Sequence, residues 1–406
     1  MHDMDIQHVG FGDLLHPEVL ADPYPLFRRL RDEDPVHEDS QGRGWMVSRY
    51  EDVEKVLADR RFSAERMLGA REGQVPPGAV QAALARQMLF LDPPDHTRLR
   101  SLFTKAFTPQ RMESLKPQVA AMVAGFLNQA LDAGGAIDFI RDFAIPLPVT
   151  VIAQMLGVPT ADRDRLRAWS VSFGKLISGR ILSVQESNEA QAGVLEFVKY
   201  FGELIAARRH HPADDMLSGL IEVEERGDRL STEELIVNLI LLLAAGHGTT
   251  THLLGNGLLA LSRHPKQWAH LVAAPSMAPA AVNELLRYDG PVQATSRQAL
   301  EDTPLANRLI KRGQQVTVFL GSANHDESRF TEPDTLDLQR TDGRLLSFGH
   351  GIHTCLGAAL ARMEAQVTFS ELARRFPNLE VDAGEPEHNP SISFRGLLAL
   401  PVSLNG

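Results

Sequence analysis

The sequence has a single cysteine, Cys355, among its 406 residues. An intramolecular disulfide is therefore impossible, and a zinc site built from several cysteines is excluded. The sequence also lacks basic runs, and its formal net charge of -11 argues against nucleic acid as the main partner, because phosphate binding requires clustered positive charge. No internal repeat is visible and no linker divides the chain, so we expect one domain spanning residues 1–406.

Long hydrophobic segments are missing as well. Residues 1–20 are acidic and polar, and they lack the positive segment followed by an apolar run that marks a secretory signal. The longest apolar run, LIVNLILLLAAG, is shorter than the about 20 residues that a membrane span requires. These two observations predict a cytoplasmic protein.

Helix signals dominate what is present. Hydrophobic residues make up 43% of the chain and charged residues 23%, as in ordinary globular proteins. Amphipathic spacing predicts helices at residues 23–35, 109–133, 138–156, 161–179 and 187–209, and residues 44–59 indicate a strand followed by a helix. Residues 305–321 predict a hairpin that turns at Arg312–Gly313, and residues 391–404 predict another short pair of strands. The expected fold is mainly α with minor β-structure.

The clearest helix begins after Ser231. Ser231 and Glu234 have the spacing of a capping box, and the helix they open should run to about Arg263. It is apolar on nearly all sides, which is typical of a helix at the centre of a large protein. Its middle reads LAAGHGTTT, where two glycines bracket His247. Each glycine costs roughly 1 kcal/mol relative to alanine, so the weakened centre needs an explanation.

The lone cysteine stands at the start of another predicted helix. After Cys355, apolar residues recur at helical spacing, whereas Gly349 and Gly351 before it permit an irregular loop. Unsatisfied N–H groups and the helix dipole favour the thiolate at such a position, which can act as a nucleophile or as a metal ligand. A buried cysteine that acts as a small hydrophobe is the alternative, but it would not require the two glycines or a polar His353.

This stretch resembles the haem-binding signature of the cytochrome P450 superfamily. The match holds at every fixed position, namely Phe348, Gly349, Gly351, His353, Cys355 and Gly357. The resemblance implies that Cys355 is the thiolate ligand of haem iron, where it donates electron density that favours O–O cleavage. It covers nearly the whole chain and implies a cytochrome P450 fold, with a long central helix over the haem and the cysteine loop on the opposite face.

Two further motifs stand in the family's order. Glu284 and Arg287 lie three residues apart on one helix face, and they resemble the family's structural ion pair, with Arg340 as a candidate third partner. By itself such a pair is more often a solvated surface pair of little energetic value. His96 and Arg100 lie four residues apart on a helix opened by prolines.

The resemblance assigns haem contacts to several of these residues. It implies that His96 and Arg100 contact the haem propionates, together with Arg297 and His353, because cationic groups pair well with carboxylates. The alternative for the first two is a solvated basic helix face. Phe348 and Gly357 complete the expected cofactor-binding residues, and haem b is the expected cofactor.

The resemblance also explains the weak centre of the long helix. Gly246 would leave room for dioxygen, and the Thr249 hydroxyl, bonded back toward a carbonyl, would loosen the helix and help deliver protons. Gly248 departs from the family pattern, which has an acid there, so water, His247 or a substrate group must replace that relay, or the chemistry differs. For His247 we retain two roles, a structural or solvent-channel role and a proton shuttle.

Family position further predicts a substrate pocket and partners. The pocket would include Leu241, Ala244, Ala245, Val292, Gln293, Thr295 and Leu397, together with the loop at about 67–90 and residues 169–190. Most of these residues are apolar or small, which favours a hydrophobic polyketide, terpenoid, steroid or fatty acyl substrate.

Electrons should come from a separate ferredoxin and ferredoxin reductase, because no flavin or iron–sulfur domain fits in 406 residues with one cysteine. A basic patch of Arg98, Arg100, Lys105 and Arg111 is the expected docking border, or else a solvated helix face.

Three functions follow from these observations. The first is a bacterial, monomeric haem-thiolate monooxygenase that uses O₂ to hydroxylate or epoxidise its substrate in secondary metabolism. The second is a haem-thiolate enzyme with another outcome, such as peroxide-driven oxidation, oxidative coupling or decarboxylation, and Gly248 motivates it. The third is a non-enzymatic haem binder or sensor, which leaves the region of Thr249 poorly explained.

Overall fold

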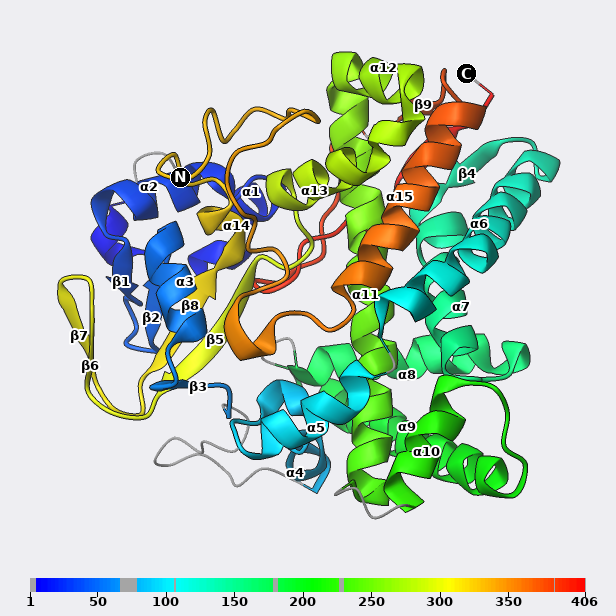
Figure 1. The fold of residues 1–406 in the computed structure, drawn as a ribbon. Coiled ribbons are helices and arrows are strands. Elements are labelled where there is room, and N and C mark those ends of the chain that lie inside the picture. The colour runs from blue at the N-terminus through cyan, green and yellow to red at the C-terminus, as the bar shows by residue number, and fades with distance from the viewer. Residues whose placement is uncertain are drawn as a thin grey trace. The chain divides into compact units, whose positions relative to one another are not determined.

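The computed structural model of the chain describes residues 5–65, 79–105, 107–177, 182–225, 230–382 and 384–405. The chain forms two compact units, each assembled from segments that are far apart in the sequence. Unit 1 comprises Met1–Phe62, Ser114–Leu147 and Thr249–Gly406, and unit 2 comprises Ser63–Glu113 and Pro148–Gly248. Helices predominate in both units, and the strands are short, which confirms the expected fold class (Figure 1). The single functional domain expected for residues 1–406 stays a prediction.

The main sheet has the strand order β1-β2-β8-β5-β3. The strands β2 and β8 pair in parallel, whereas β1–β2 and β5–β8 pair antiparallel. Val47, Val316 and Val318 are fully buried in the core between this sheet and its helices. β-branched side chains of this kind suit a pleated surface that is buried. The strand bounds are Val36–Glu38 (β1), Trp45–Val47 (β2), Phe62–Ser63 (β3), Ala294–Ala299 (β5) and Gln315–Phe319 (β8).

The hairpin expected at Arg312–Gly313 has different partners. The chain does turn there, and Gly313 has a φ of 83°. However, the strand before the turn, β7 (Arg308–Ile310), pairs with β6 (Thr303–Leu305), while the strand after it, β8, joins β2 and β5. The apolar side chains of β8 are buried when it has a neighbour on each side, whereas β7 is largely exposed. The prediction was wrong about pairing because burial, rather than the turn, selects the partner.

The predicted pair within residues 391–404 was also wrong. The strand β10 (Pro401–Ser403) pairs with β4 (Ala136–Asp138) and β9 (Glu380–Val381), both of them outside that segment. The residues before β10 form only isolated bridges, between Val292 and Phe394 and between His388 and Leu397. Local strand propensity in this segment therefore indicated a strand but not its partners.

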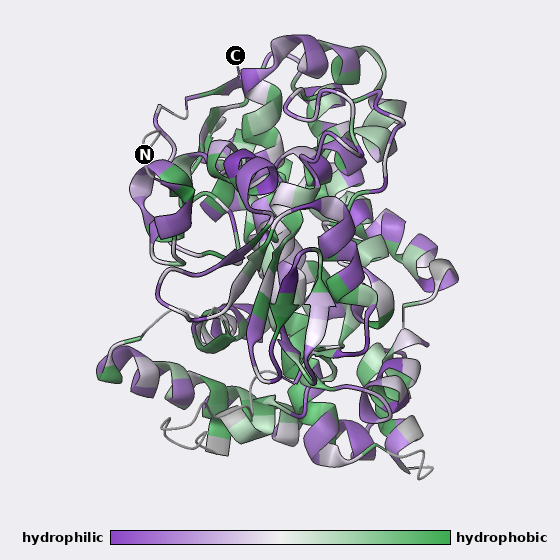
Figure 2. Cartoon of the chain, turned by 90° about the vertical axis from the view of Figure 1, so that its left-hand side faces the viewer, coloured by the Kyte–Doolittle hydropathy of each residue, from purple (hydrophilic) through white to green (hydrophobic). Residues whose placement is uncertain are grey.

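Unit 1 also contains several helices, and α3 and α14 contact the main sheet. Hydrophilic and hydrophobic residues alternate along the outer helices, as expected of amphipathic segments (Figure 2). Helices α13 and α15 pack against each other. Their bounds are Pro17–Ala21 (α1), Tyr24–Glu33 (α2), Tyr50–Ala58 (α3), Pro109–Asp132 (α6, which begins in unit 2), Pro265–Ala273 (α12), Ala278–Tyr288 (α13), Leu320–Ala323 (α14) and Ala358–Arg375 (α15).

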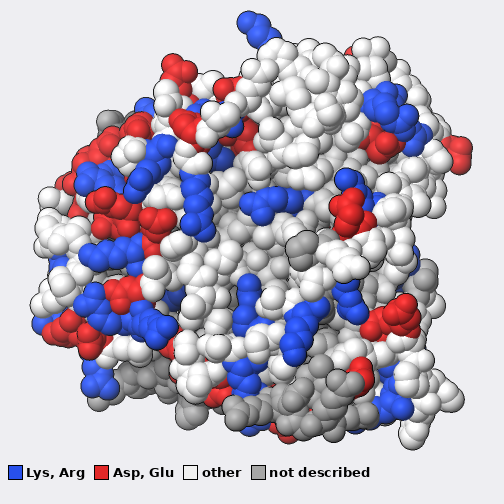
Figure 3. Space-filling view, in the orientation of Figure 1, with Lys and Arg blue, Asp and Glu red and all other residues white. Residues whose placement is uncertain are grey.

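On the side of unit 1 formed by α2, α3 and the β6–β7 hairpin, acidic and basic side chains are interspersed (Figure 3). Exposed ion pairs join Arg308 to Asp34 at 3.1 Å and Lys311 to Asp302 at 2.8 Å. Exposed pairs contribute at most about 1 kcal/mol each. The excess of acidic residues is therefore not gathered into one acidic patch on this side.

Unit 2 is helical. Helices α8 and α9 pack through Trp169, whose ring lies 5.6 Å from Phe197 and 5.5 Å from Tyr200, centroid to centroid. The helix expected at 138–156 is divided into a π-helical turn at Ile140–Ala144, which belongs to unit 1, and α7, which begins in unit 1 and continues in unit 2. The division occurs because Pro146 lacks the N–H group that a continuous helix would use. The bounds are Ala79–Leu84 (α4), Asp95–Thr104 (α5), Pro146–Met155 (α7), Arg163–Ile177 (α8), Val184–His210 (α9) and Met216–Glu225 (α10).

The long helix α11 (Thr232–Arg263) matches its prediction closely. The Ser231 amide donates to Glu234 Oε2 at 2.9 Å, and the Glu234 amide donates to Ser231 Oγ at 3.1 Å, so the capping box is confirmed. Among the described helices, α11 alone has the length and apolar composition of a membrane span. This is weak evidence, because the core helix of a protein passes the same test, and 61% of its most apolar window is buried.

Candidate active site

The loop around Cys355 is held by its own backbone. The Cys355 amide donates to the Phe348 carbonyl at 2.9 Å, and the Thr354 amide and hydroxyl both donate to the Gly351 carbonyl. Gly351 has a φ of 74°, and a Cβ atom there would lie 2.7 Å from the Leu57 carbonyl oxygen of α3. Only glycine avoids both the strained backbone and this clash. The loop therefore packs closely against the end of α3.

The thiol of Cys355 is exposed just before α15, which begins at Ala358. The N-cap residue is Gly357, which has no side chain to bind the first N–H groups of the helix. These N–H groups and the helix dipole favour negative charge nearby. A thiolate at this position can serve as a metal ligand or as a nucleophile.

The surroundings of Cys355 fit a haem group. No group of three or more His, Cys, Asp or Glu side chains that could hold a metal ion occurs in the described part of the chain. An iron bound by this sulfur would need other ligands of the kind that a porphyrin supplies. A Cβ atom on Gly357 would meet nothing within 4 Å, and one on Gly349 would meet only the His353 carbonyl at 4.0 Å. The backbone beside the sulfur thus borders open space, which a haem group could use.

Two predicted propionate partners lie in the same unit as Cys355. Arg297 projects from β5, is 5% exposed and donates from Nη1 to the Ser296 carbonyl at 2.9 Å. His353 lies in the 3₁₀ turn Gly351–His353 and is half-buried. Phe348, also half-buried, begins the loop. The other two predicted partners belong to unit 2, where α5 carries a buried His96 and, one turn later, a half-buried Arg100.

The centre of α11 combines burial with open space. The helix is continuous through Gly246 and Gly248. A Cβ atom on Gly248 would meet nothing within 4 Å, and one on Gly246 would make only ordinary contacts with Ile152, the nearest at 3.6 Å. Ala245 is exposed although the helix is apolar, whereas His247 is buried. Packing of the described chain therefore does not require these two glycines, and they leave room beside the helix.

The ring of His247 is tied to its own helix. Its Nδ1 lies 3.1 Å from the Leu243 carbonyl oxygen, one turn earlier. A carbonyl can only accept, so Nδ1 carries the proton and Nε2 is the acceptor. Burial lowers the pKa of His247 below its usual value, and the Leu243 carbonyl opposes this only in part. His247 is therefore neutral at neutral pH.

The predicted pocket residues occupy different environments. In unit 2, Leu241 is buried and Ala244 half-buried; in unit 1, Val292 and Thr295 are half-buried and Leu397 is buried. Gln293 has a structural environment, since its Nε2 donates to the Gly290 carbonyl at 2.8 Å and its Oε1 lies against Gly321. Of the predicted pocket loops, residues 66–78 and 178–181 lie outside the described residues.

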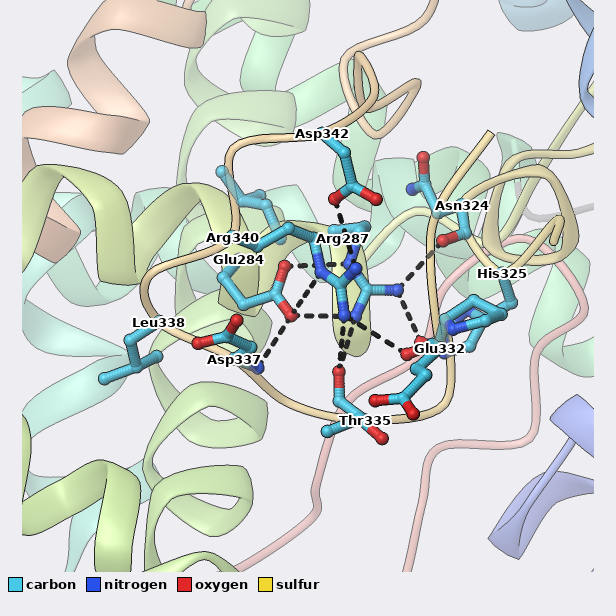
Figure 4. Close-up of polar contacts among 12 residues, drawn as sticks. Glu284, Arg287, Asn324, His325, Glu332, Thr335, Asp337, Leu338, Arg340 and Asp342 are labelled. Atoms are coloured by element: carbon cyan, nitrogen blue, oxygen red, sulfur yellow. Dashed lines mark hydrogen bonds and ion pairs between the residues drawn. The ribbon is translucent and has the colours of Figure 1, made fainter. Parts of the chain in front are cut away.

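Glu284 is the centre of a buried ion network (Figure 4). Its two carboxylate oxygens accept from Arg287 Nε and Nη2, both at 2.8 Å, and Arg340 Nε donates to Oε1 at 3.1 Å. Arg287 also donates to the carbonyls of Asn324, Pro333 and Thr335, so all five of its N–H groups are used. The network fastens residues 331–342 to α13, immediately before the cysteine loop.

Asn324 and Ser347, which fix the start of the cysteine loop, were not predicted from the sequence. The Asn324 side chain accepts from the Leu346 amide at 2.7 Å and donates to Ser347 Oγ at 2.8 Å, and Ser347 Oγ donates to the Leu286 carbonyl at 2.6 Å. All three side-chain bonds are buried. Ser347 precedes the signature directly, but no spacing in the sequence links it to Asn324.

We predict that Glu284→Gln destabilises the protein strongly. The amide keeps the size of the side chain but leaves the buried guanidinium groups of Arg287 and Arg340 without their shared counter-charge. The free energy of unfolding should fall by about 3–5 kcal/mol, as measured by denaturant titration. The matched control is Glu371→Gln, whose partner Arg374 is 63% exposed, and it should change stability by less than about 0.5 kcal/mol. Equal effects of the two substitutions would contradict the central role of Glu284.

Comparisons with known proteins agree with this geometry. The cytochrome P450 family profile matches residues 155–404. Cytochrome P450 107B1 of Saccharopolyspora erythraea is 41% identical, over 95% of this chain and 98% of that protein. Cytochrome P450 monooxygenase PikC of Streptomyces venezuelae is 40% identical, over 96% and 92%. The structure of P450BioI in complex with hexadec-9Z-enoic acid ligated acyl carrier protein has a TM-score of 0.89 and 38% identity, covering 96% and 100%. The chain therefore belongs to the cytochrome P450 family, and it is an oxidoreductase whose cofactor is haem.

Proposed function

We propose that this protein uses O₂ to hydroxylate or epoxidise a hydrophobic small molecule of the polyketide, terpenoid, steroid or fatty acyl type, in secondary metabolism. The presence of two features in one chain carries the proposal. The chain has a single exposed thiol before α15, and it also has a buried apolar helix, α11, whose glycines border open space. The thiol would act as the haem ligand, and the space beside α11 would accommodate the small molecules that react.

In this proposal, the Cys355 thiolate would bind the haem iron. When bound, the haem supplies the redox chemistry of its iron with O₂, which a thiolate ligand promotes. Arg297 and His353 would bind propionate groups through charge-assisted hydrogen bonds. His96 and Arg100 stay predictions of the same kind for unit 2.

The residues of α11 would handle dioxygen and protons. Gly246 leaves space, and the Thr249 hydroxyl can donate a hydrogen bond and hold a water molecule that carries a proton. For His247, the buried neutral ring and its bond to Leu243 support the structural role over the proton shuttle. A shuttle would have to become charged, which burial disfavours.

The hydrophobic substrate is supported by the composition of α11. Leu241, Ala244 and Ala245 add apolar surface, and the exposure of Ala245 shows that one side of the helix is not covered by the described chain of its unit. The acyl chain bound by P450BioI is a hydrophobic molecule of the proposed kind. Gln293 would contribute less than expected, because its amide is engaged within unit 1.

We predict that Cys355→Ser abolishes thiolate ligation. In the wild-type protein the reduced carbon monoxide complex should show the red-shifted Soret band of a thiolate-bound haem, and the serine variant should lack it because its oxygen is a different ligand. The far-ultraviolet circular dichroism spectrum checks that the variant is folded. A folded variant that keeps the red-shifted band would refute the assignment of Cys355.

A second candidate function is supported by Gly248. An acid at this position would have room, since a Cβ atom meets nothing within 4 Å, so the missing acid is not a packing requirement. Without it, proton delivery relies on water, on the substrate or on a different oxidant. A haem-thiolate enzyme driven by peroxide, or one that couples or decarboxylates its substrate, is the alternative.

We predict that Gly248→Glu changes the fraction of electrons that reach product. The carboxylate would add a proton relay, so the product formed per electron consumed should change in an assay with O₂ and a ferredoxin system. The same preparation is assayed with peroxide, where turnover should change less. If rate and coupling stay the same in both assays, proton delivery does not pass through position 248.

A ferredoxin is the proposed electron donor, docking beside α5. Part of the expected basic patch is neutralised, because Arg98 binds Glu234 at 2.6 Å and Asp95 at 2.8 Å. Lys105 and Arg111 are both exposed and lie in unit 2. These two residues add exposed positive charge that would attract an acidic partner.

We predict that reversing the charge of Lys105 and Arg111 together slows reduction by ferredoxin, most strongly at low ionic strength, where screening is weak. Stopped-flow reduction measures the rate. The matched control reverses the charge of Lys199 on α9 and Lys266 on α12, which are also exposed. Equal rates for both double variants would remove the proposed docking role.

A further inference from the structure

Arg362 links the cysteine loop to a neighbouring helix. It lies near the start of α15, seven residues after Cys355 in the sequence. The carbon at the centre of its guanidinium lies 4.3 Å from the centroid of the Phe348 ring, well within the range of a cation–π contact. Its Nε donates to Asn283 Oδ1 on α13 at 2.9 Å. The guanidinium is thus held on one side by an amide and on the other by an aromatic face.

The same guanidinium is within electrostatic reach of the sulfur. Burial lowers the pKa of Arg362, and the charge of Cys355 acts in the opposite direction. The group still stays charged at neutral pH, because arginine titrates far above it. Phe348 connects the two residues a second way, since its ring contacts Arg362 and its carbonyl accepts from the Cys355 amide at 2.9 Å.

We propose that Arg362 is a positioning residue that sets the electron donation of the Cys355 thiolate. Its fixed positive charge, held by Asn283 and by the Phe348 ring, stabilises negative charge on the sulfur. It thereby reduces the electron density that the sulfur donates to the iron. This inference rests on the proposed role of Cys355 as haem ligand.

The direction of the effect follows from electrostatics. Reduction of the haem adds one negative charge, and a nearby positive charge stabilises that state. Arg362 therefore raises the reduction potential, and its loss should make the haem harder to reduce. With the guanidinium removed, the sulfur donates more strongly, and the iron–sulfur bond should stiffen.

The test compares holoenzyme variants by potential and spectroscopy. Arg362→Gln removes the charge, Arg362→Lys keeps it while losing the planar group, and Arg374→Gln removes one exposed charge from the same helix. Equilibrium redox titration is done without ferredoxin, so that docking cannot contribute. Resonance Raman spectroscopy gives the iron–sulfur stretching frequency, and the reduced carbon monoxide complex is recorded for each variant.

We expect Arg362→Gln to shift the potential to more negative values and the iron–sulfur frequency upward. Arg362→Lys should shift both less, and Arg374→Gln should leave both unchanged. If Arg362→Gln lowers haem content or thermal stability but leaves potential and frequency at wild-type values, Arg362 is merely structural and the proposal is overturned. A wild-type protein without the thiolate band would instead refute the proposed role of Cys355 itself, so the two failures are distinguishable.

Discussion

The buried carboxylate of Glu284 determines where the chain that leads to Cys355 can lie. Burying charge is costly unless every charged group has partners. Here Arg287 and Arg340 share one acid, Arg340 also binds Asp342, and their remaining N–H groups bind backbone carbonyls. Those carbonyls belong mostly to residues 331–335. An irregular segment thereby acquires a fixed path without forming helix or strand. Asn324 and Ser347 extend the fixation to the first residues of the cysteine loop.

Helix α11 meets two opposed demands. It is stabilised by its capping box and by buried leucines on both sides of its centre, so it tolerates a centre of poor helix formers. Its glycines have two distinct purposes. A Cβ atom on Gly255 would lie 2.5 Å from Ile140, and one on Gly257 would lie 2.7 Å from Phe369, so these two permit close packing. Gly246 and Gly248 face no such contact, so the described chain leaves space beside them.

Local sequence signals predicted those elements whose structure depends on residues close together in the chain. The capping box at Ser231, the bounds of α11 and the loop around Cys355 were all readable, because each depends on residues within a few positions of one another. The partners of the strands could not be predicted from the sequence. Gly313 makes a real turn, yet β7 and β8 find other partners, because a buried sheet selects them by side-chain burial over long sequence separations.

The same limit applies to the candidate site. The signature residues could be named from the resemblance to the cytochrome P450 family, whereas Asn324 and the contact of Arg362 with Phe348 depend on three-dimensional proximity. Gln293, whose pocket role stays a prediction, shows a related limit. Its position in the family pattern placed it in the substrate pocket, but its amide is occupied by the Gly290 carbonyl. Motif position gives a residue's place along the chain, and only packing shows what its side chain can reach.

The exposed thiol of Cys355 has a practical consequence, because the chain has no other sulfhydryl group. In a protein whose sulfur is bound to haem iron, a maleimide or disulfide reagent has nothing to modify. With the proposed ligation by Cys355, each equivalent of label incorporated would count one molecule that has lost its cofactor. Thiol labelling would thus measure cofactor occupancy, and it could follow haem loss during storage or heating without any colour measurement.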